Sequence, residues 1–406
     1  MDFSPIELPP DVQQFWMNDV CAFYDEHLSA EILATERRGG NGYLPELDRA
    51  LAERGWLDPM APVEDGGAAL DGLRAAVIAA EELRRAGVFP VKGSHHLVMA
   101  VLDQFASDEL AAELTVGVRR GETHFCLGYT EPDCGSDAAA ITTRALRDGD
   151  EWIVTGQKMF STGAHMCQYV MMTARTNPDV SKHKGITMFL VPLDLEGIET
   201  QGIGTLGGER TNFIYFDGAR VADRYRLGPV DHGWKVASGA LAAEHGLDAE
   251  HGAMKPRTRV DLELVDALAG ETGWARILDQ ALAAAVEWAR VSRRPDGTHP
   301  IDDPLVRVRL ARIELDCELR AATPSPYVRV MSADAMIRDT ADLMDLTGAA
   351  GLLSTEDPQC VGDGIIEYAH RFAQATSTYG GTNEIHRNLI AEQFLGLPRH
   401  RGAIRS

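Results

Sequence analysis

The spacing of apolar residues changes twice along this chain of 406 residues. Up to about residue 121, segments such as "DVQQFWMNDVCAFYDEHL" and "LRAAVIAAEELRRAG" place apolar side chains three and four positions apart, which predicts amphipathic helices. From residue 122 to 230, short runs such as "QYVMMTART" and "GITMFLVPL" are rich in β-branched and aromatic residues, which predicts strands. The helical spacing then returns. We therefore predict an α+β multidomain chain: a helical domain (1–121), a β domain (122–230) and a helical bundle (231–406).

Composition excludes several classes of partner. The formal net charge of -22 argues against nucleic acid or an anionic membrane surface. No apolar run approaches the roughly 20 residues of a membrane-spanning helix, and the N-terminal residues lack the pattern of a secretory signal. The six cysteines are scattered without paired spacing, and the adjacent His95 and His96 have no metal-ligand partners at useful spacing. We expect a cytoplasmic, reduced protein with no disulfide framework and no metal site.

Two polar loops follow predicted strands. In "YTEPDCGSD" (residues 129–137), the hydroxyls of Thr130 and Ser136 could bind a polar ligand, although a surface turn explains the same residues. In "GQKMFSTGA" (residues 156–164), Phe160 and Thr162 would share one face of a strand. A ring and a hydroxyl on one face suit the edge of an isoalloxazine ring, whereas Phe160 alone would be a core residue.

A third motif, "TYGGTNEIHRN", lies near the C-terminus at residues 378–388. Two glycines stand between an aromatic residue and the start of an apolar helix, "LIAEQFLGL". Glycines let backbone N–H groups approach a ligand closely, and a helix start favours anions. The motif therefore predicts a ligand-binding turn.

Together, "TEPDCGSD", "GQKMFSTGA" and "GGTNEIHRNLIAEQFLGLPR" resemble the acyl-CoA dehydrogenase family of flavoproteins, and the resemblance covers nearly the whole chain. It implies a helical domain, a β-barrel-like domain and a four-helix bundle in that order. It also implies FAD as the cofactor, which supplies the hydride chemistry while the protein supplies orientation and electrostatics.

The resemblance also assigns roles to residues. Positions expected at the FAD are Tyr129, Thr130, Ser136, Phe160, Thr162, Thr382 and Glu384. Positions expected at the substrate thioester are Ser136, Tyr379 and Gly380. In "DLTGAAG", Asp345 and Gly348 match a segment that binds the FAD of a neighbouring subunit, with Asp345 where Gln is common.

The catalytic base departs from the usual family pattern. Many members have a Glu directly after the tyrosine of the third motif, where this chain has Gly380. The Gly380 N–H could polarise a thioester carbonyl, but glycine cannot take a proton. A minority branch places the base on a helix of the bundle, and Glu244 in "GALAAEHGL" matches it. An ordinary solvated glutamate is the alternative for Glu244, and Glu384 is a poorer candidate for the base.

A second departure lies in "WARVSRRPDGTHPIDDPLV". Family members usually have Arg followed by Phe-Gly here, reaching across a dimer to the FAD pyrophosphate. Arg293 or Arg294 could take the phosphate role, which suits a guanidinium, but no aromatic residue follows. The alternative is a solvent-facing basic pair.

The main hypothesis is an FAD-dependent acyl-CoA dehydrogenase that forms a trans-2-enoyl thioester. Glu244 would take the α-proton, the β-hydride would pass to flavin N5, and an electron-transfer flavoprotein would accept the electrons. A homotetramer or dimer is expected, and the carrier could be CoA or an acyl carrier protein. Two alternatives stay open: a flavin-dependent monooxygenase or oxidase of the same fold, and a non-catalytic subunit of a heteromeric acyl-CoA dehydrogenase.

Overall fold

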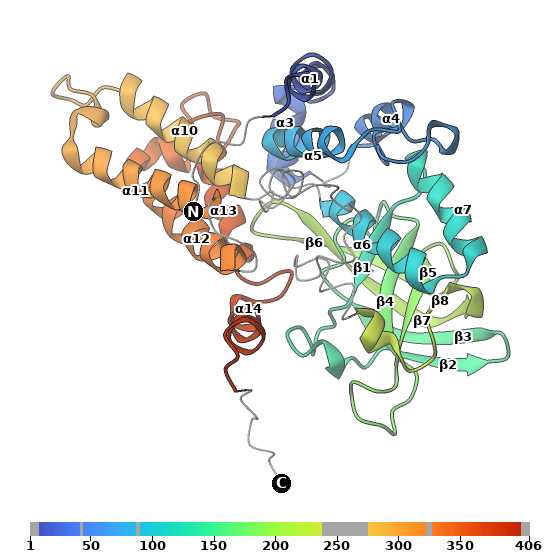
Figure 1. Ribbon diagram of the computed structural model, residues 1–406. Helices are drawn as coiled ribbons and strands as arrows, with labels where there is room; N and C mark the ends of the chain where they lie inside the picture. The colour runs from blue at the N-terminus through green and yellow to red at the C-terminus, as the bar shows by residue number, and fades with distance from the viewer. Residues whose placement is uncertain (1–7, 41–43, 87–89, 238–274, 322–326, 399–406) are drawn as a thin grey trace, which may run out of the picture. The chain divides into compact units, whose positions relative to one another are not determined.

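The computed structural model describes residues 8–40, 44–86, 90–237, 275–321 and 327–398 (Figure 1). The chain divides into two compact units, Met1–Gly270 and Glu271–Ser406. The first unit contains both the N-terminal helices and the β-sheet, and the second contains the C-terminal helices. The predicted fold class is confirmed, while the division into three domains remains our interpretation.

The first unit begins with helices. They are α1 (Pro10–Phe15), the π-helical turn η1 (Trp16–Val20), α2 (Cys21–His27), α3 (Ala30–Gly39), α4 (Pro45–Glu53), α5 (Gly72–Ala86), α6 (Pro90–Phe105) and α7 (Asp108–Arg119). Ser107 ends the α6–α7 connection as the N-cap of α7, because its hydroxyl accepts the Leu110 N–H. The helical prediction for this region is confirmed.

In the described part of the first unit, the sheet has eight strands in the order β6-β7-β3-β2-β4-β5-β8, with β1 paired to β4. The strands are β1 (Phe125–Gly128), β2 (Arg144–Asp148), β3 (Glu151–Lys158), β4 (Tyr169–Arg175), β5 (Ile186–Pro192), β6 (Ile198–Gly204), β7 (Arg210–Ala222) and β8 (Arg226–Leu227). The two residues Gly149 and Asp150 join β2 to β3 in an antiparallel hairpin, which the "DG" signal predicts.

Both faces of the central strands are buried. Side chains alternate along β4 and β5, so Met171, Met188 and Leu190 belong to one apolar cluster with residues of α6 and α7. Val170 and Phe189 point the other way, into a second cluster within the β domain. Burial on both sides explains why "GITMFLVPL" is a continuous apolar run rather than an alternating one.

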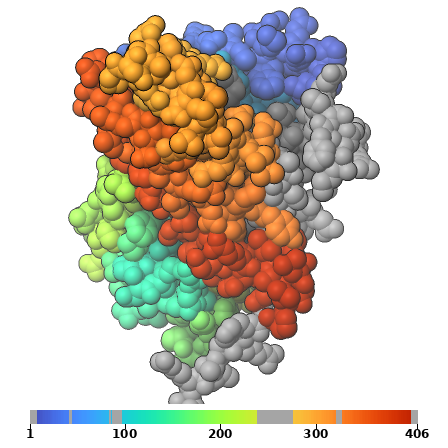
Figure 2. Space-filling view, turned by 90° about the vertical axis from the view of Figure 1, so that its left-hand side faces the viewer, coloured from blue at the N-terminus to red at the C-terminus, as the bar shows by residue number. Residues whose placement is uncertain are grey.

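The second unit is a helical bundle. Its elements are α10 (Ala275–Val291), α11 (Pro304–Ala321), α12 (Tyr327–Thr347), α13 (Ile365–Thr376) and the short α14 (Asn383–Leu389), which continues as the π-helical turn η7 (Ile390–Phe394). The four longer helices pack against one another, and the space-filling view shows them as continuous orange and red surfaces (Figure 2). Among the described residues, no helix has the length and apolar character needed to cross a membrane.

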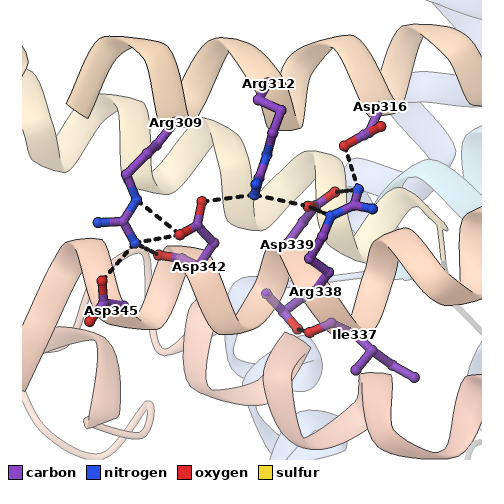
Figure 3. A network of polar contacts seen from close by, with 9 residues as sticks. Arg309, Arg312, Asp316, Ile337, Arg338, Asp339, Asp342 and Asp345 are labelled. Atoms are coloured by element: carbon purple, nitrogen blue, oxygen red, sulfur yellow. Dashed lines mark hydrogen bonds and ion pairs between the residues drawn. The ribbon is translucent and has the colours of Figure 1, made fainter. Parts of the chain in front are cut away.

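Helices α11 and α12 are joined by a network of charged side chains (Figure 3). Its members are Arg309, Arg312 and Asp316 of α11 and Arg338, Asp339, Asp342 and Asp345 of α12. Asp339 is fully buried, 2.9 Å from Nε of Arg338 and 3.5 Å from Nη2 of Arg312. Burial raises the pKa of the Asp339 carboxyl to about 6, although the hydrogen bond and charge of Arg338 lower it.

Replacing Asp339 by Asn tests this network. Because the pKa of Asp339 is about 6 in the folded state against an ordinary 3.8, the folded state holds the proton more tightly. Stability is therefore lost as the pH rises through this window. Asn stays uncharged, so Asp339→Asn should gain up to about 3 kcal/mol relative to wild type between about pH 4 and pH 7. Urea denaturation measures the free energy of unfolding at each pH.

Asp345→Asn is the matched control on the same helix. Its carboxylate is exposed and pairs with Arg309 at the surface, so the change should be small at every pH. A difference between Asp339→Asn and wild type that does not vary with pH would contradict the assignment.

Candidate functional site

A buried ion pair joins the first two predicted ligand loops. Lys158, the last residue of β3, is fully buried, and its ammonium lies 2.8 Å from the carboxylate of Glu131, which is also buried. Glu131 belongs to the loop after β1, the loop that also holds Thr130 and Ser136. Next to the ion pair, the Met159 N–H donates to the Thr130 carbonyl at 2.9 Å. The two loops are therefore fixed side by side.

The Glu131 carboxylate has further donors. It accepts from the Thr142 N–H at 2.6 Å, the Thr142 hydroxyl at 2.8 Å and the Thr143 N–H at 3.1 Å. Burial alone would raise the pKa of Glu131, but the Lys158 charge and these hydrogen bonds hold the pKa below its ordinary value. Burial lowers the pKa of Lys158 against the opposing effect of Glu131. Glu131 is thus a buried carboxylate whose charge is stabilised from several sides.

Phe160 has an unusual backbone. Its φ of 59° lies in the left-handed region, which costs a residue with a side chain on the order of 1–2 kcal/mol. The next residue is held tightly, because the Ser161 N–H donates to the Asn212 carbonyl and the Asn212 side chain donates to the Ser161 carbonyl, both at 3.0 Å. The Phe160 side chain is 56% exposed. The structure therefore presents a strained aromatic residue on the surface of this unit.

The prediction that Phe160 and Thr162 share one face of a strand is wrong. Strand β3 ends at Lys158, and residues 159–166 form an irregular segment and a turn. The alternative that Phe160 is a core residue is also wrong, because most of its side chain is exposed.

The segment after β3 fits a flat aromatic cofactor. The Thr162 hydroxyl donates to the Thr211 hydroxyl at 3.2 Å, and the buried Ser161 hydroxyl has no hydrogen-bond partner among the described residues. An exposed ring and a nearby hydroxyl are what an isoalloxazine edge would contact, whereas the Ser161 hydroxyl is buried away from such a ligand. Tyr129 is half-buried beside the sheet's helix-covered cluster, and Ser136 is exposed.

The third motif lies in the second unit. Gly380 and Gly381 have φ values of 60° and 87°, which glycine adopts without strain. Arg329 of α12 donates to the Tyr379 carbonyl at 2.7 Å, and Nε2 of His386 lies 2.9 Å from the Gly380 carbonyl. Two side chains therefore hold two consecutive carbonyl groups of this turn.

Residues 382–384 start helix α14. The Thr382 hydroxyl accepts the Ile385 N–H at 3.3 Å as the N-cap. Glu384 is exposed in the first helical turn, 3.6 Å from Arg387. Thr382 is therefore a helix cap as well as a predicted cofactor contact, and the exposure of Glu384 leaves it accessible to a ligand.

The remaining predicted cofactor residues have protein partners. Arg293 donates to the Gly297 carbonyl at 3.1 Å from an exposed position, and Arg294 pairs with Asp303 at 3.0 Å. Asp345 pairs with Arg309 at 2.6 Å. Gly348 has a φ of 57° and begins the short 3₁₀ helix Gly348–Leu352 after α12. Arg294 and Asp345 thus pair with side chains of opposite charge, whereas the described partner of the Arg293 guanidinium is a neutral carbonyl.

The proposed base, Glu244, lies outside the described residues, within 238–274. Its role as the base stays a prediction.

Sequence reasoning missed the residues that hold the three motifs in place. Lys158 and Glu131 belong to the first two motifs, but a single sequence does not reveal that these two charged side chains are buried against each other. Arg329 is about 50 residues from its acceptor, so no local pattern reveals the contact. His386 could have been noticed, because it lies only six residues after Gly380, on the helix α14 that follows the glycine turn.

Three family profiles match the chain in order. Residues 10–122 match the acyl-CoA dehydrogenase N-terminal domain, residues 126–219 the middle domain, and residues 321–395 the C-terminal domain.

Individual relatives agree with these profiles. The chain is 30% identical over 419 residues to the acyl-CoA dehydrogenase IpdE1 of Mycobacterium tuberculosis, covering 96% of this chain and 98% of the relative. Among solved structures, it is similar to the ChsE4-ChsE5 complex of Mycobacterium tuberculosis (26% identity, TM-score 0.81, 98% and 100% of the chains covered). It is also similar to the Tcur3481-Tcur3483 steroid ACAD (26% identity, TM-score 0.79, 98% and 100% covered).

Replacing Phe160 separates stability from cofactor binding. Phe160→Ala and Phe160→Gly both remove the exposed ring, but only glycine relieves the left-handed backbone. We expect Phe160→Gly to be more stable than Phe160→Ala by about 1 kcal/mol in urea denaturation. Both variants should bind FAD more weakly than wild type in a fluorescence titration. Undiminished FAD affinity in both would remove the ring from the cofactor site.

Replacing Lys158 by Met tests the buried ion pair. The change leaves Glu131 buried without its cation and should cost about 3 kcal/mol near pH 7. Without Lys158, burial dominates and the pKa of Glu131 rises, so the carboxyl takes a proton as the pH falls. The cost measured by urea denaturation should therefore shrink toward about pH 4.

Lys182→Met is the control for this change. Lys182 pairs with Asp137 at 2.5 Å, with both side chains about half exposed, so its loss should cost less than about 1 kcal/mol. A Lys158→Met cost as small as that of the control would contradict the stabilising role of the buried pair.

Proposed function

Because the chain belongs to the acyl-CoA dehydrogenase family, we propose that it oxidises an acyl-CoA with a bulky acyl chain to the trans-2-enoyl thioester. The match of three consecutive family domains is the observation on which this proposal depends. The chain is an oxidoreductase of this family and uses FAD.

When bound, FAD would supply the acceptor for the hydride from the β-carbon of the acyl chain. In this proposal Phe160 would contact the flavin ring, and the Thr162 hydroxyl would hydrogen-bond at its N5 edge. The tie between Lys158 and Glu131 keeps the two loops of the first unit in register, so that the exposed ring stays in place. Tyr129, Thr130 and Ser136 contribute from the neighbouring loop, and Arg293 contacts the pyrophosphate.

The proton chemistry requires a base and a polarised thioester. The α-proton of a thioester is too weakly acidic for a carboxylate unless charge on the carbonyl oxygen is stabilised. We assign that stabilisation to the Gly380 N–H and the base to Glu244. Support for a base elsewhere than the third motif comes from the motif itself, since glycine at position 380 has no group that takes a proton.

Two solved relatives suggest the substrate and the assembly. One is a steroid ACAD, and both are named as pairs of chains, Tcur3481-Tcur3483 and ChsE4-ChsE5. We propose a steroid-like or similarly bulky acyl group, with an electron-transfer flavoprotein as electron acceptor.

A heteromeric assembly is the second candidate function. In it this chain would supply only part of an active site, as glycine at position 380 and the missing Phe-Gly pair after Arg293 favour.

The proposal is tested with the full-length protein and a panel of acyl-CoAs. We expect the purified protein to contain flavin, whose visible absorption bleaches anaerobically on addition of a matching acyl-CoA. Glu244→Gln should slow the bleaching by about 1,000-fold, because the proton then has no acceptor. Stopped-flow absorbance gives both rates.

Glu318→Gln is the control, since Glu318 is an exposed carboxylate of α11 to which no role at the site is assigned. It should bleach at close to the wild-type rate. If Glu244→Gln is as fast as wild type, Glu244 is not the base. A protein that is purified without flavin and gains it only with a second, related subunit would favour the heteromeric function.

A further inference from the structure

The glycine turn of the third motif is held by two side chains from outside it. We propose that Arg329 and His386 are positioning residues that aim the N–H groups of Gly380 and Gly381 at the carbonyl oxygen of the thioester. This inference rests on the proposed function, because it needs a thioester at the turn.

Arg329 acts on the first peptide group of the turn. Its Nη2 donates to the Tyr379 carbonyl at 2.7 Å, and its guanidinium lies over the Tyr379 ring, 5.8 Å from the ring centre. The Tyr379 carbonyl and the Gly380 N–H belong to the same planar, trans peptide group, so they point in opposite directions. Fixing the carbonyl therefore fixes the direction of the N–H. A charged donor on the carbonyl also polarises the peptide and strengthens its N–H as a donor.

His386 acts on the second peptide group. Its Nε2 lies 2.9 Å from the Gly380 carbonyl, and because a carbonyl only accepts, Nε2 must bear the hydrogen. The same planar geometry then fixes the Gly381 N–H. His386 is 1% exposed. Burial and the charge of Arg329 lower the pKa of its imidazole, whereas the hydrogen bond to the Gly380 carbonyl raises it. The imidazole is therefore a neutral, rigid donor at neutral pH.

External support is needed because the turn itself is made of glycine. Gly380 and Gly381 have no side chains to restrict them, and glycine populates several backbone regions almost equally. The start of helix α14 is anchored separately, since Asn383 donates to Asp334 of α12 at 2.8 Å. Arg329 and Asp334 both come from α12, so one long helix positions both the turn and the helix that follows it.

Preorganised N–H donors are effective only when they already point at the developing charge. Removing one donor of this kind costs about 100-fold or more in rate. Loosening a donor without removing it should cost less. Arg329 and His386 are therefore expected to affect the rate of flavin reduction more than the affinity for the thioester.

The test uses FAD-loaded, full-length protein. The substrate is the acyl-CoA that bleaches wild type fastest among straight-chain, branched and steroid side-chain thioesters. Arg329→Met and His386→Leu remove the donors, while His386→Gln keeps an amide donor of similar reach. Arg387→Gln is the control, because Arg387 pairs with Asp334 at the surface and has no described contact with the turn's backbone. Thermal melting checks that each variant is folded.

Arg329→Met and His386→Leu should each slow bleaching at saturating substrate by about tenfold or more, with the dissociation constant of the enoyl-CoA product within about threefold of wild type. The infrared carbonyl stretch of that product, labelled with ¹³C at the thioester, should move to higher frequency as the hydrogen bonds weaken. His386→Gln should recover most of the rate, and Arg387→Gln should match wild type.

Wild-type rates and an unshifted carbonyl stretch in both donor-removing variants would overturn this inference alone. Slower rates that follow the loss of folded protein, with an unshifted stretch, would also overturn it, because the role would then be structural. Wild-type protein that no thioester of the panel bleaches would overturn the proposed function and this inference with it.

Discussion

The β domain depends on a charge buried at the end of a central strand. The ammonium of Lys158 is fully buried, and only an anionic partner with its own hydrogen bonds makes such burial tolerable. Glu131 is that partner, and three donors from Thr142 and Thr143 complete its shell. The geometry requires the loop after β1 to lie beside the end of β3. The residues of this unit that we assign to the flavin ring come from these two loops, so their arrangement depends on the contact between Lys158 and Glu131.

In the second unit, the backbone N–H of Gly380 stands where many family members have a glutamate side chain. A Glu at position 380 would combine proton acceptance with a place in the turn, but glycine offers only its N–H. Arg329 and His386 restrain that flexible backbone by binding its carbonyls. In each unit, side chains therefore hold an irregular segment in place. Lys158 and Glu131 hold the two loops of the first unit, and Arg329 and His386 hold the glycine turn of the second.

The sequence predicts the fold well because periodicity is a local property. The strand runs, the "DG" hairpin and the long bundle helices all follow from spacing within about 20 residues. The site is predicted only in part. The motifs mark the two loops that the Lys158–Glu131 pair holds together, but the left-handed backbone of Phe160 and the end of β3 depend on partners such as Asn212, about 50 residues away. Contacts between residues so far apart cannot be predicted from the spacing of residues in a single sequence.

The central claim is that this chain oxidises an acyl thioester although its terminal turn lacks a base. The most direct measurement is anaerobic addition of an acyl-CoA panel to the purified flavoprotein, with the visible flavin absorption followed over time. The account predicts rapid bleaching by at least one bulky acyl-CoA and release of the trans-2-enoyl product. A flavin that stays oxidised with every thioester, yet is reduced by NADH or NADPH, would contradict it.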